Sequence, residues 1–319
     1  MSKSFKPLFE ERLKKLMPNE QDFQAFTNIV QTPPQNYIRC NTLKMPAEQL
    51  KQRLSKKWNM VQPFPQHPEI LLIDQWLNPG ELGNALEHLL GYYYVQELCS
   101  MMSVLALSPQ PEEFVLDLCA SPGSKTTQIA AAMQNRGTLI ANDIKLDRIK
   151  ILAANLERCG ATNTIVTKID AIALCAKLEK TGFRFDKILL DAPCSGEGTL
   201  RSSPKTFDMW NERMIDHFSR QQKKLIAFAL KILKVGGTLV YSTCTHAPEE
   251  NEEVINFALK NFPVKLESLT LPIKCRPGLT NWKSDSFNPE VQKTCRIYPQ
   301  DNNTEGFFVS KLTLIEDLK

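Results

Sequence analysis

Two cysteines stand where the sequence predicts the ends of two buried strands. Cys194 lies in LDAPCSGEGTLRSSP, and Cys244 lies further along the chain in YSTCTHAPEEN. A thiolate is a strong nucleophile, so a cysteine at an accessible strand end is a candidate for covalent catalysis. The alternative is that both are small buried hydrophobic residues, the common state of free cysteines in a reducing compartment. If they are catalytic, the pair raises the question of which sulfur attacks.

Acidic residues also mark the ends of predicted strands. From Phe114 onward strands alternate with helices, which predicts parallel pairing through right-handed crossovers. Asp117, Asp143, Asp170 and Asp191 all fall at the carboxyl ends of these strands. Open α/β sheets bind their ligands at this edge. One Asp there is often only a helix N-cap, but its recurrence favours a binding cleft that contains both cysteines.

The first loop at this edge is DLCASPGSKT, residues 117–126. It lacks the GxGxxG pattern of dinucleotide-binding folds and the first glycine of a P-loop, so it does not predict a phosphate cradle. Its small residues instead let the backbone approach a ligand closely. The residues that we expect to bind the ligand here are Cys119, Ala120, Ser121, Pro122, Gly123, Ser124 and Lys125.

Three residues beyond this loop are typical of an adenosyl site. Asp143 ends the second strand, where an acidic residue holds ribose hydroxyls, and Arg148 lies five residues later, on the next helix turn over the same ligand. Asp170 follows the third strand and is placed to accept a hydrogen bond from the adenine amine. An adenosyl ligand without phosphate indicates S-adenosylmethionine (SAM) as the cofactor.

The elements that carry these residues predict an α/β domain over residues 106–319. We expect a Rossmann-like methyltransferase core: a mostly parallel seven-stranded sheet with an antiparallel last strand. Its five parallel strands lie near residues 114–119, 138–143, 163–170, 185–193 and 236–244, and the last two near 264–269 and 307–315. The segment from 274 to 305 is polar and shows little periodicity.

Residues 1–105 predict a smaller α+β domain of RRM-like type, preceded by helices within residues 5–30. Residues 1–60 hold eleven Lys and Arg against five Asp and Glu, although the whole chain carries a formal charge of only +4. This basic excess suits a polyanion such as RNA. A solvated helix face, with lysine stems covering apolar surface, explains the same excess equally well.

The composition indicates a globular protein without a membrane span. The chain has 319 residues, of which 42% are hydrophobic, and no apolar run has the roughly 20 residues that cross a bilayer. With no secretory signal pattern at the N-terminus, we expect a cytoplasmic protein, and a monomer. Nine cysteines include no CxxC pair, and the four histidines lack metal-ligand spacing. Neither a metal site nor a disulfide framework is therefore expected.

Several segments resemble the Sun-type (Nol1/Nop/Sun) RNA cytosine-5 methyltransferases. They are CASPGSK, DAPCSGEGTLRSSP, YSTCTHAPEENEEV and TEGFFVSKL, with YIRCNTL and YYYVQELCSMM before the core. The resemblance runs along nearly the whole chain. It implies SAM-dependent methylation of carbon 5 of cytosine in RNA, with transfer RNA preferred to ribosomal RNA because no further RNA-binding domain follows the core.

The resemblance also implies roles for the reactive residues. Carbon 5 of cytosine is a weak nucleophile, and a thiolate that adds to carbon 6 activates it. In similar RNA enzymes the TC cysteine attacks and the PC cysteine assists release, which assigns attack to Cys244 and release to Cys194. Asp191 would contact the cytosine edge near N3 and N4, with Lys125 beside it, and would touch the cofactor's methionine part.

The basic front domain is expected to bind RNA phosphates, together with Arg201 and Lys205 after the GEGTL sequence. The target base must be unpaired or flipped to reach the cleft. Two other classes remain as alternatives. A non-catalytic RNA-binding assembly factor is disfavoured by the intact reactive residues. A DNA cytosine methyltransferase is disfavoured because its attacking cysteine belongs to a PC motif and no target-recognition insert is seen.

Overall fold

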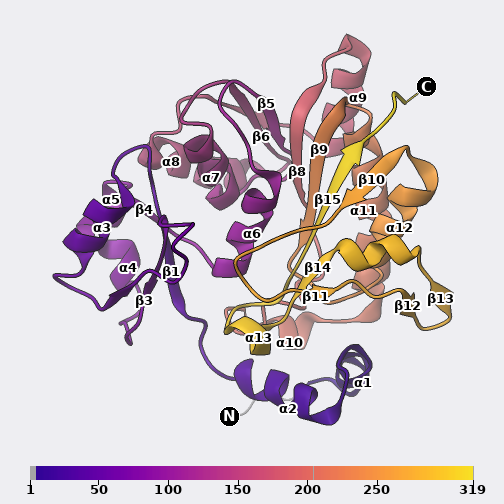
Figure 1. Ribbon diagram of the computed structural model, residues 1–319, viewed down its shortest axis with the longest axis horizontal. Helices are drawn as coiled ribbons and strands as arrows, with labels where there is room; N and C mark the ends of the chain where they lie inside the picture. Colours follow the sequence, from indigo (N-terminus) through magenta and orange to yellow (C-terminus); the bar gives the residue numbers. More distant parts are fainter. Residues whose placement is uncertain (1–4, 204, 319) are drawn as a thin grey trace.

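Five parallel strands form the centre of the larger sheet in the computed structural model, which describes residues 5–203 and 205–318 (Figure 1). They are β5 (Phe114–Asp117), β6 (Thr138–Asp143), β7 (Thr164–Lys168), β8 (Phe185–Asp191) and β9 (Leu233–Thr243). Their spatial order is β7-β6-β5-β8-β9, so the strand order reverses between β5 and β8. A reversal of this kind opens a crevice at the carboxyl ends of the strands, where such folds bind ligands.

Antiparallel strands complete this sheet beyond β9. β15 (Phe307–Leu314) pairs with β9, and β10 (Val264–Glu267) pairs with β15, both antiparallel. A mostly parallel sheet with an antiparallel last strand is thereby confirmed. Among the described residues the sheet has nine strands where seven were predicted, because β14 (Cys295–Ile297) and β11 (Arg276–Pro277) pair beside β15. Both come from the polar segment 274–305, whose strands are too short to show a hydrophobic period.

Helices cover both faces of the larger sheet. On one face lie α6 (Leu98–Leu107), α7 (Ser124–Ala132) and α8 (Leu146–Cys159); on the other lie α9 (Ala171–Thr181), α11 (Glu212–Leu230) and α12 (Glu252–Asn261). The strands alternate accordingly: Ile188 and Leu190 belong to the core with α11 and α12, while Leu189 packs with α6 and α7. Successive strand side chains point to opposite faces, so a strand buried on both sides reads as a continuous apolar run.

A second, four-stranded sheet belongs to the N-terminal part of the chain. It contains β1 (Asn36–Cys40), β2 (Met60–Val61), β3 (Ile70–Ile73) and β4 (Tyr93–Val95), all antiparallel in the order β2-β3-β1-β4. The helices between its strands are α3 (Ala47–Leu54), α4 (Glu81–Asn84) and α5 (Leu86–Leu89). This βαββααβ order agrees with the expected α+β module. The division of the chain near residue 105 stays a prediction.

The first two helices, α1 (Pro7–Leu16) and α2 (Glu20–Ile29), lie below the larger sheet in Figure 1 and away from the small sheet. Phe9 stacks on Trp210 with ring centroids 4.8 Å apart, and Phe26 contacts His246 edge-on at 5.5 Å. Burial of these aromatic side chains joins α1 and α2 to the core that contains α11 and α12.

The small sheet is anchored next to the predicted cofactor loop by a buried arginine. Arg39 of β1 is 2% exposed and donates hydrogen bonds to the backbone oxygen of Ser124 at 2.6 Å and to Thr127 Oγ1 at 2.8 Å. Asn41 donates to the backbone oxygen of Cys159 at the end of α8 at 2.7 Å. Because Ser124 directly follows the loop after β5, the bonds from Arg39 fasten the module to the end of that loop, while Asn41 fastens it to α8.

The polar segment 274–305 folds into short elements rather than an irregular loop. Besides β11 and β14 it contains β12 (Asn281–Trp282), β13 (Asp285–Ser286), a 3-10 helix (Pro289–Lys293) and α13 (Pro299–Asn302). Cys275 and Cys295 form a disulfide with their Cα atoms 5.2 Å apart, so the expectation of no disulfide was wrong. The two cysteines are 20 residues apart in sequence, and only the pairing of β11 with β14 brings them together.

The remaining helix, α10 (Lys205–Met209), follows the loop that contains Cys194. Within the described residues, every helix is too short or too polar to cross a bilayer.

Candidate active site

The two cysteines at the strand ends face each other. Cys194 follows β8 and Cys244 follows β9, and these strands pair in parallel as far as Asp191 and Ser242. As a result the Sγ atoms lie 3.2 Å apart, and both residues are partly exposed. The hydrogen bond with Cys244, together with burial, raises the pKa of the Cys194 thiol well above its usual range. The Cys194 thiol therefore stays protonated directly beside the Cys244 sulfur.

Asp191 and Lys125 form an ion pair at the same edge. Lys125 Nζ donates to Asp191 Oδ2 at 2.7 Å, and Ser242 Oγ donates to Asp191 Oδ1 at 2.8 Å. Burial acts against the Lys125 charge, but the carboxylate of Asp191 outweighs it and raises the Lys125 pKa above its ordinary value. The ammonium also lies 5.4 Å from the ring centre of Phe307. A fixed carboxylate and a fixed ammonium thus converge next to the sulfur pair.

The loop after β5 is held by its neighbours in the sheet. Leu118 N donates to the backbone oxygen of Leu189 at 3.0 Å, and Ala120 N donates to the backbone oxygen of Asn142 at 2.8 Å. Gly123 begins α7 with a φ of 104°, a left-handed conformation that glycine adopts without strain, and an added Cβ would come within 3.0 Å of Leu152. The backbone of the predicted cofactor loop is thereby fixed at the sheet edge.

The predicted ribose and adenine residues occupy two neighbouring strand ends. Arg148 Nε donates to Asp143 Oδ2 at 3.0 Å, and its Nη2 donates to the backbone oxygen of Ser121 at 2.7 Å, which links the loop to the end of β6. Asp170 caps α9 by accepting from Ala173 N at 3.0 Å. These residues fit an adenosyl group: an acidic side chain ends β6, and a loop of small residues lies beside it. Asp117 instead is buried beneath the loop, where burial raises its pKa to about 7.

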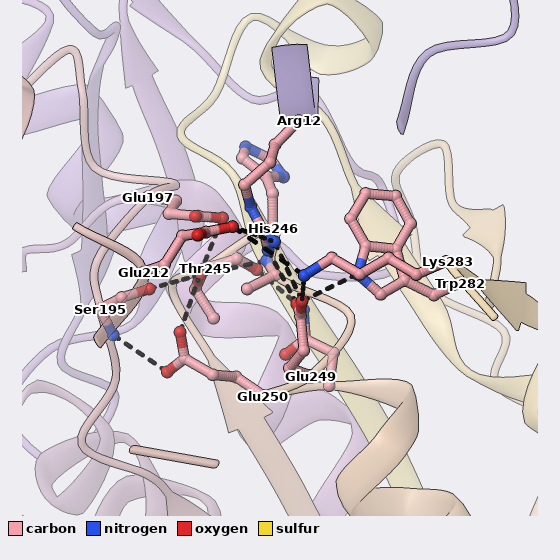
Figure 2. A network of polar contacts seen from close by, with 12 residues as sticks. Arg12, Ser195, Glu197, Glu212, Thr245, His246, Glu249, Glu250, Trp282 and Lys283 are labelled. Carbon is pink, nitrogen blue, oxygen red and sulfur yellow. Dashed lines mark hydrogen bonds and ion pairs between the residues drawn. The ribbon is translucent and has the colours of Figure 1, made fainter. Parts of the chain in front are cut away.

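Buried carboxylates form a network with Ser195 and Thr245, the residues that follow the two cysteines (Figure 2). Glu250 accepts hydrogen bonds from Ser195 N at 3.0 Å and Gln222 Nε2 at 2.9 Å, and burial raises its pKa to about 7. Glu197 accepts from Trp210 Nε1 at 2.7 Å, and burial raises its pKa as well. Neither residue was predicted from the sequence to be functional, nor were Ser242 and Phe307. Their positions within the SGEGTL, APEEN, YSTC and TEGFF segments were the only available signal.

Two glycines allow the backbones of the loops that contain Cys194 and Cys244 to approach closely. Gly198 N donates to the backbone oxygen of Cys244 at 2.9 Å, and Gly306 N donates to the backbone oxygen of Gly198 at 2.8 Å. A Cβ on Gly198 would lie 2.2 Å from the Gly306 oxygen, so only glycine permits this approach.

The expected phosphate contact at Arg201 was wrong. The Arg201 side chain points into the protein and donates to the backbone oxygens of Thr304 at 2.8 Å and Pro33 at 2.6 Å. It is only 8% exposed, because the loop after β8 packs against the chain before β1 and before β15. Lys205 is exposed at the start of α10, and its phosphate contact stays a prediction.

Some of the basic side chains within residues 1–60 also lie inside the protein. Arg12 pairs with Glu249 through two hydrogen bonds of 2.9 and 2.7 Å, and Arg39 lies buried against α7. Among the described residues, no group of three or more His, Cys, Asp or Glu side chains is arranged to hold a metal ion.

The sheet order, the glycine-containing loop after β5 and the acidic end of β6 define the class of SAM-dependent methyltransferases with a Rossmann-like core. Comparisons with known proteins give the family. The family model for 16S rRNA methyltransferase RsmB/F matches residues 104–313, and that for the N-terminal domain of 16S rRNA methyltransferase RsmF matches residues 5–98. The chain therefore belongs to the RsmB/F methyltransferase family, which confirms the predicted SAM-dependent RNA cytosine-5 methyltransferase.

Two curated relatives differ in the share of their length that matches. A tRNA (cytosine(49)-C(5))-methyltransferase of Pyrococcus abyssi is 42% identical over 313 residues, which cover 97% of this chain and 98% of that protein. The ribosomal RNA small subunit methyltransferase F of Vibrio cholerae is 39% identical over 308 residues. This chain spans only 63% of that second protein.

Solved structures show the same fold. A methyltransferase homologue from Pyrococcus horikoshii superimposes with a TM-score of 0.85 at 33% identity, covering 98% of this chain and 96% of the other. NSun6 from Pyrococcus horikoshii, solved with the SAM analogue SFG, also gives 0.85, at 26% identity and covering 99% of this chain and all of the other.

Proposed function

We propose that this chain methylates carbon 5 of a cytosine in tRNA through a covalent enzyme–base adduct. The observation that carries the proposal is the pair of sulfur atoms 3.2 Å apart beside the Lys125–Asp191 ion pair. A structural role for the cysteines would not require both sulfurs at the ligand-binding edge of the sheet. An assembly factor without catalysis would not require the adjoining ion pair.

Cys244 is the proposed nucleophile. Its thiolate adds to carbon 6 of cytosine, which forms an S–C6 bond and moves electron density to carbon 5. SAM, when bound, supplies an electrophilic methyl group. After carbon 5 has been methylated it carries both the methyl group and its original hydrogen. Loss of that hydrogen as a proton restores the double bond, breaks the S–C6 bond and returns Cys244 as a thiolate.

Cys194 assists this release. Its sulfur is in hydrogen-bond contact with the Cys244 sulfur, so it lies where the S–C6 bond must break. Asp191 faces the N3–N4 edge of the base and steadies the charge that develops on the ring, while Lys125 and Ser242 hold the carboxylate in one orientation. Hydrogen bonds that fix a carboxylate in advance reduce the reorganisation needed during the reaction.

The cofactor would lie across the loop of residues 119–125, with Asp143 accepting from the ribose hydroxyls. The Asp143 carboxylate is already oriented by the 3.1 Å bond from Lys145 N and the 3.0 Å bond from Arg148. Asn142 of β6 donates to the backbone oxygens of Leu118 and Ile169, and so holds the ends of β5 and β7 together. Asp170 directly follows Ile169, and it is proposed to contact the adenine amine.

Asp143→Asn is expected to weaken SAM binding about 10- to 100-fold, because hydrogen bonds to a charged acceptor contribute roughly 1.5–3 kcal/mol. Isothermal titration calorimetry with SAM measures this change. Asp147→Asn is the matched control, since Asp147 lies on the first turn of α8 with its side chain 95% exposed. Equal affinity of the Asp143 variant and the wild-type protein would remove Asp143 from the cofactor site.

Transfer RNA is preferred as the substrate because the chain matches a tRNA-modifying relative over nearly its whole length, whereas it spans 63% of the rRNA-modifying one. Ribosomal RNA is the second candidate, supported by the two family models.

The test is bisulfite sequencing after incubating unmodified tRNA or 16S rRNA with the purified chain and SAM. We expect new 5-methylcytosine in tRNA, with position 49 examined first. Methylation of the ribosomal transcript alone would reassign the substrate. No methylated cytosine in either RNA, with SAM bound normally, would support the assembly-factor alternative.

A further inference from the structure

The residues immediately after the two reactive cysteines are joined to each other. Ser195 follows Cys194, Thr245 follows Cys244, and their hydroxyl oxygens lie 2.8 Å apart within hydrogen-bond distance. Both residues are buried, with exposures of 7% and 1%. The two cysteine loops are therefore linked directly behind the sulfur atoms and not only through the strands that precede them.

One carboxylate reaches both loops (Figure 2). Glu250 Oε2 accepts from Ser195 N at 3.0 Å, and Glu250 Oε1 lies 3.5 Å from Thr245 Oγ1, at the limit of a hydrogen bond. Gln222 of α11 extends the link, because its Nε2 donates both to Glu250 Oε2 at 2.9 Å and to the backbone oxygen of Pro193 at 2.8 Å. The turn of residues 193–195 is thus held from both sides of Cys194.

Glu250 is itself fixed in place. It is fully buried, and Tyr241 of β9 donates its hydroxyl to the Glu250 backbone oxygen at 2.5 Å. Gln222 is also fully buried. A buried polar group that loses its partner costs about 1–3 kcal/mol, so these bonds oppose any displacement of the turn. A fully buried carboxylate held this way acts through the two cysteine loops that it contacts.

We propose that Glu250 is a positioning residue that sets the separation of the Cys194 and Cys244 sulfurs. The proposal rests on the proposed function, in which Cys194 must lie beside the S–C6 bond when it breaks. Displacement of a catalytic group by about 1 Å can cost on the order of 100-fold in rate. Loosening the turn that carries Cys194 should therefore slow release more than attack. Glu250 and Gln222 bond to the residues on both sides of Cys194, whereas the Glu250 side chain approaches Thr245, the residue after Cys244, only at 3.5 Å.

Glu250→Met tests the proposal with an unbranched side chain of similar length that carries no oxygen. Ser195 N and Gln222 Nε2 both donate to Glu250 Oε2, and a thioether sulfur is only a weak acceptor, so this substitution removes the strong acceptor from both donors. We expect kcat to fall at least tenfold, the KM for SAM to stay unchanged, and the fraction of enzyme bound covalently to RNA on a denaturing gel to rise.

Glu249→Met is the matched control, since Glu249 is the preceding residue in the same network. Its carboxylate accepts two bonds from Arg12 and one of 2.9 Å from Trp282, and it contacts neither cysteine loop. This variant should lower the melting temperature because it weakens a largely buried ion pair, but it should leave the covalent fraction unchanged. The control therefore separates loss of stability from loss of position.

Ser195→Ala provides a second variant if Glu250→Met does not fold. It removes only the hydroxyl bond to Thr245 and should shift the covalent fraction in the same direction by a smaller amount. Cys194→Ala, run in the same assay, reports on the proposed function. If Cys194→Ala accumulates the covalent complex but both the Glu250 and Ser195 variants behave as wild type, the positioning role is refuted while the function stands. If Cys194→Ala shows no accumulation, the release step itself is wrong.

Discussion

Cys244→Ala is expected to abolish methyl transfer, with a loss of at least about 10⁴-fold, the scale seen when a covalent nucleophile is removed. Without the S–C6 bond, carbon 5 of cytosine stays too weak a nucleophile to take the methyl group. The measurement is incorporation of radiolabelled methyl groups from SAM into tRNA. No covalent enzyme–RNA complex should form on a denaturing gel.

Cys175→Ala provides the control for loss of a cysteine. Cys175 is a free thiol buried in α9, and its pKa is raised to about 12 by burial, so it should not react. This variant should keep wild-type activity. A Cys244 variant that still transfers methyl groups at a rate near wild type would exclude the proposed adduct at this residue.

Cys194→Ala is expected to accumulate the covalent complex instead of preventing it. Attack by Cys244 remains available, but the sulfur 3.2 Å away that assists release has been removed. Loss of a general acid–base group costs about 10²- to 10⁴-fold, so turnover should fall by that amount while the first methyl transfer proceeds. A denaturing gel with labelled RNA, combined with rapid-quench analysis of the first turnover, measures both effects.

The double variant Cys194→Ala/Cys244→Ala is the control, because it should form no covalent complex. If Cys194→Ala turned over normally while Cys244→Ala trapped RNA, the two roles would be exchanged. Such exchange is a concrete alternative, since DNA cytosine methyltransferases attack with the cysteine of a PC motif.

Much of the larger domain could be predicted from local sequence patterns. The apolar runs before Asp117, Asp143 and Asp191 are long enough to identify strands buried on both faces, and their alternation with helices predicts parallel pairing. The antiparallel strand at residues 307–314 was expected as well. Once these strands are parallel, their acidic ends and both cysteines must meet at one edge, and the structure places Lys125 against Asp191 and Cys194 against Cys244 there.

Long-range contacts could not be predicted in the same way. Arg201 looked like an RNA contact because it follows a polar loop, yet it bonds to the backbone of Pro33 and Thr304, which are distant in sequence. Cys275 and Cys295 meet only because two strands of two and three residues pair. Segments that short carry no period from which pairing can be inferred.

The sequence by itself determined the order of strands and helices, the composition of the cofactor loop and the residue types at the strand ends, because these depend on neighbours close in the chain. Only the tertiary structure decided which charged residues are internal and how the cysteine loops are held. Glu250 lies in the acidic stretch just before α12, and in sequence it resembles a residue that favours a helix start. Its burial between Ser195, Thr245 and Gln222 arises from packing three distant segments behind the sulfur pair, which no local pattern encodes.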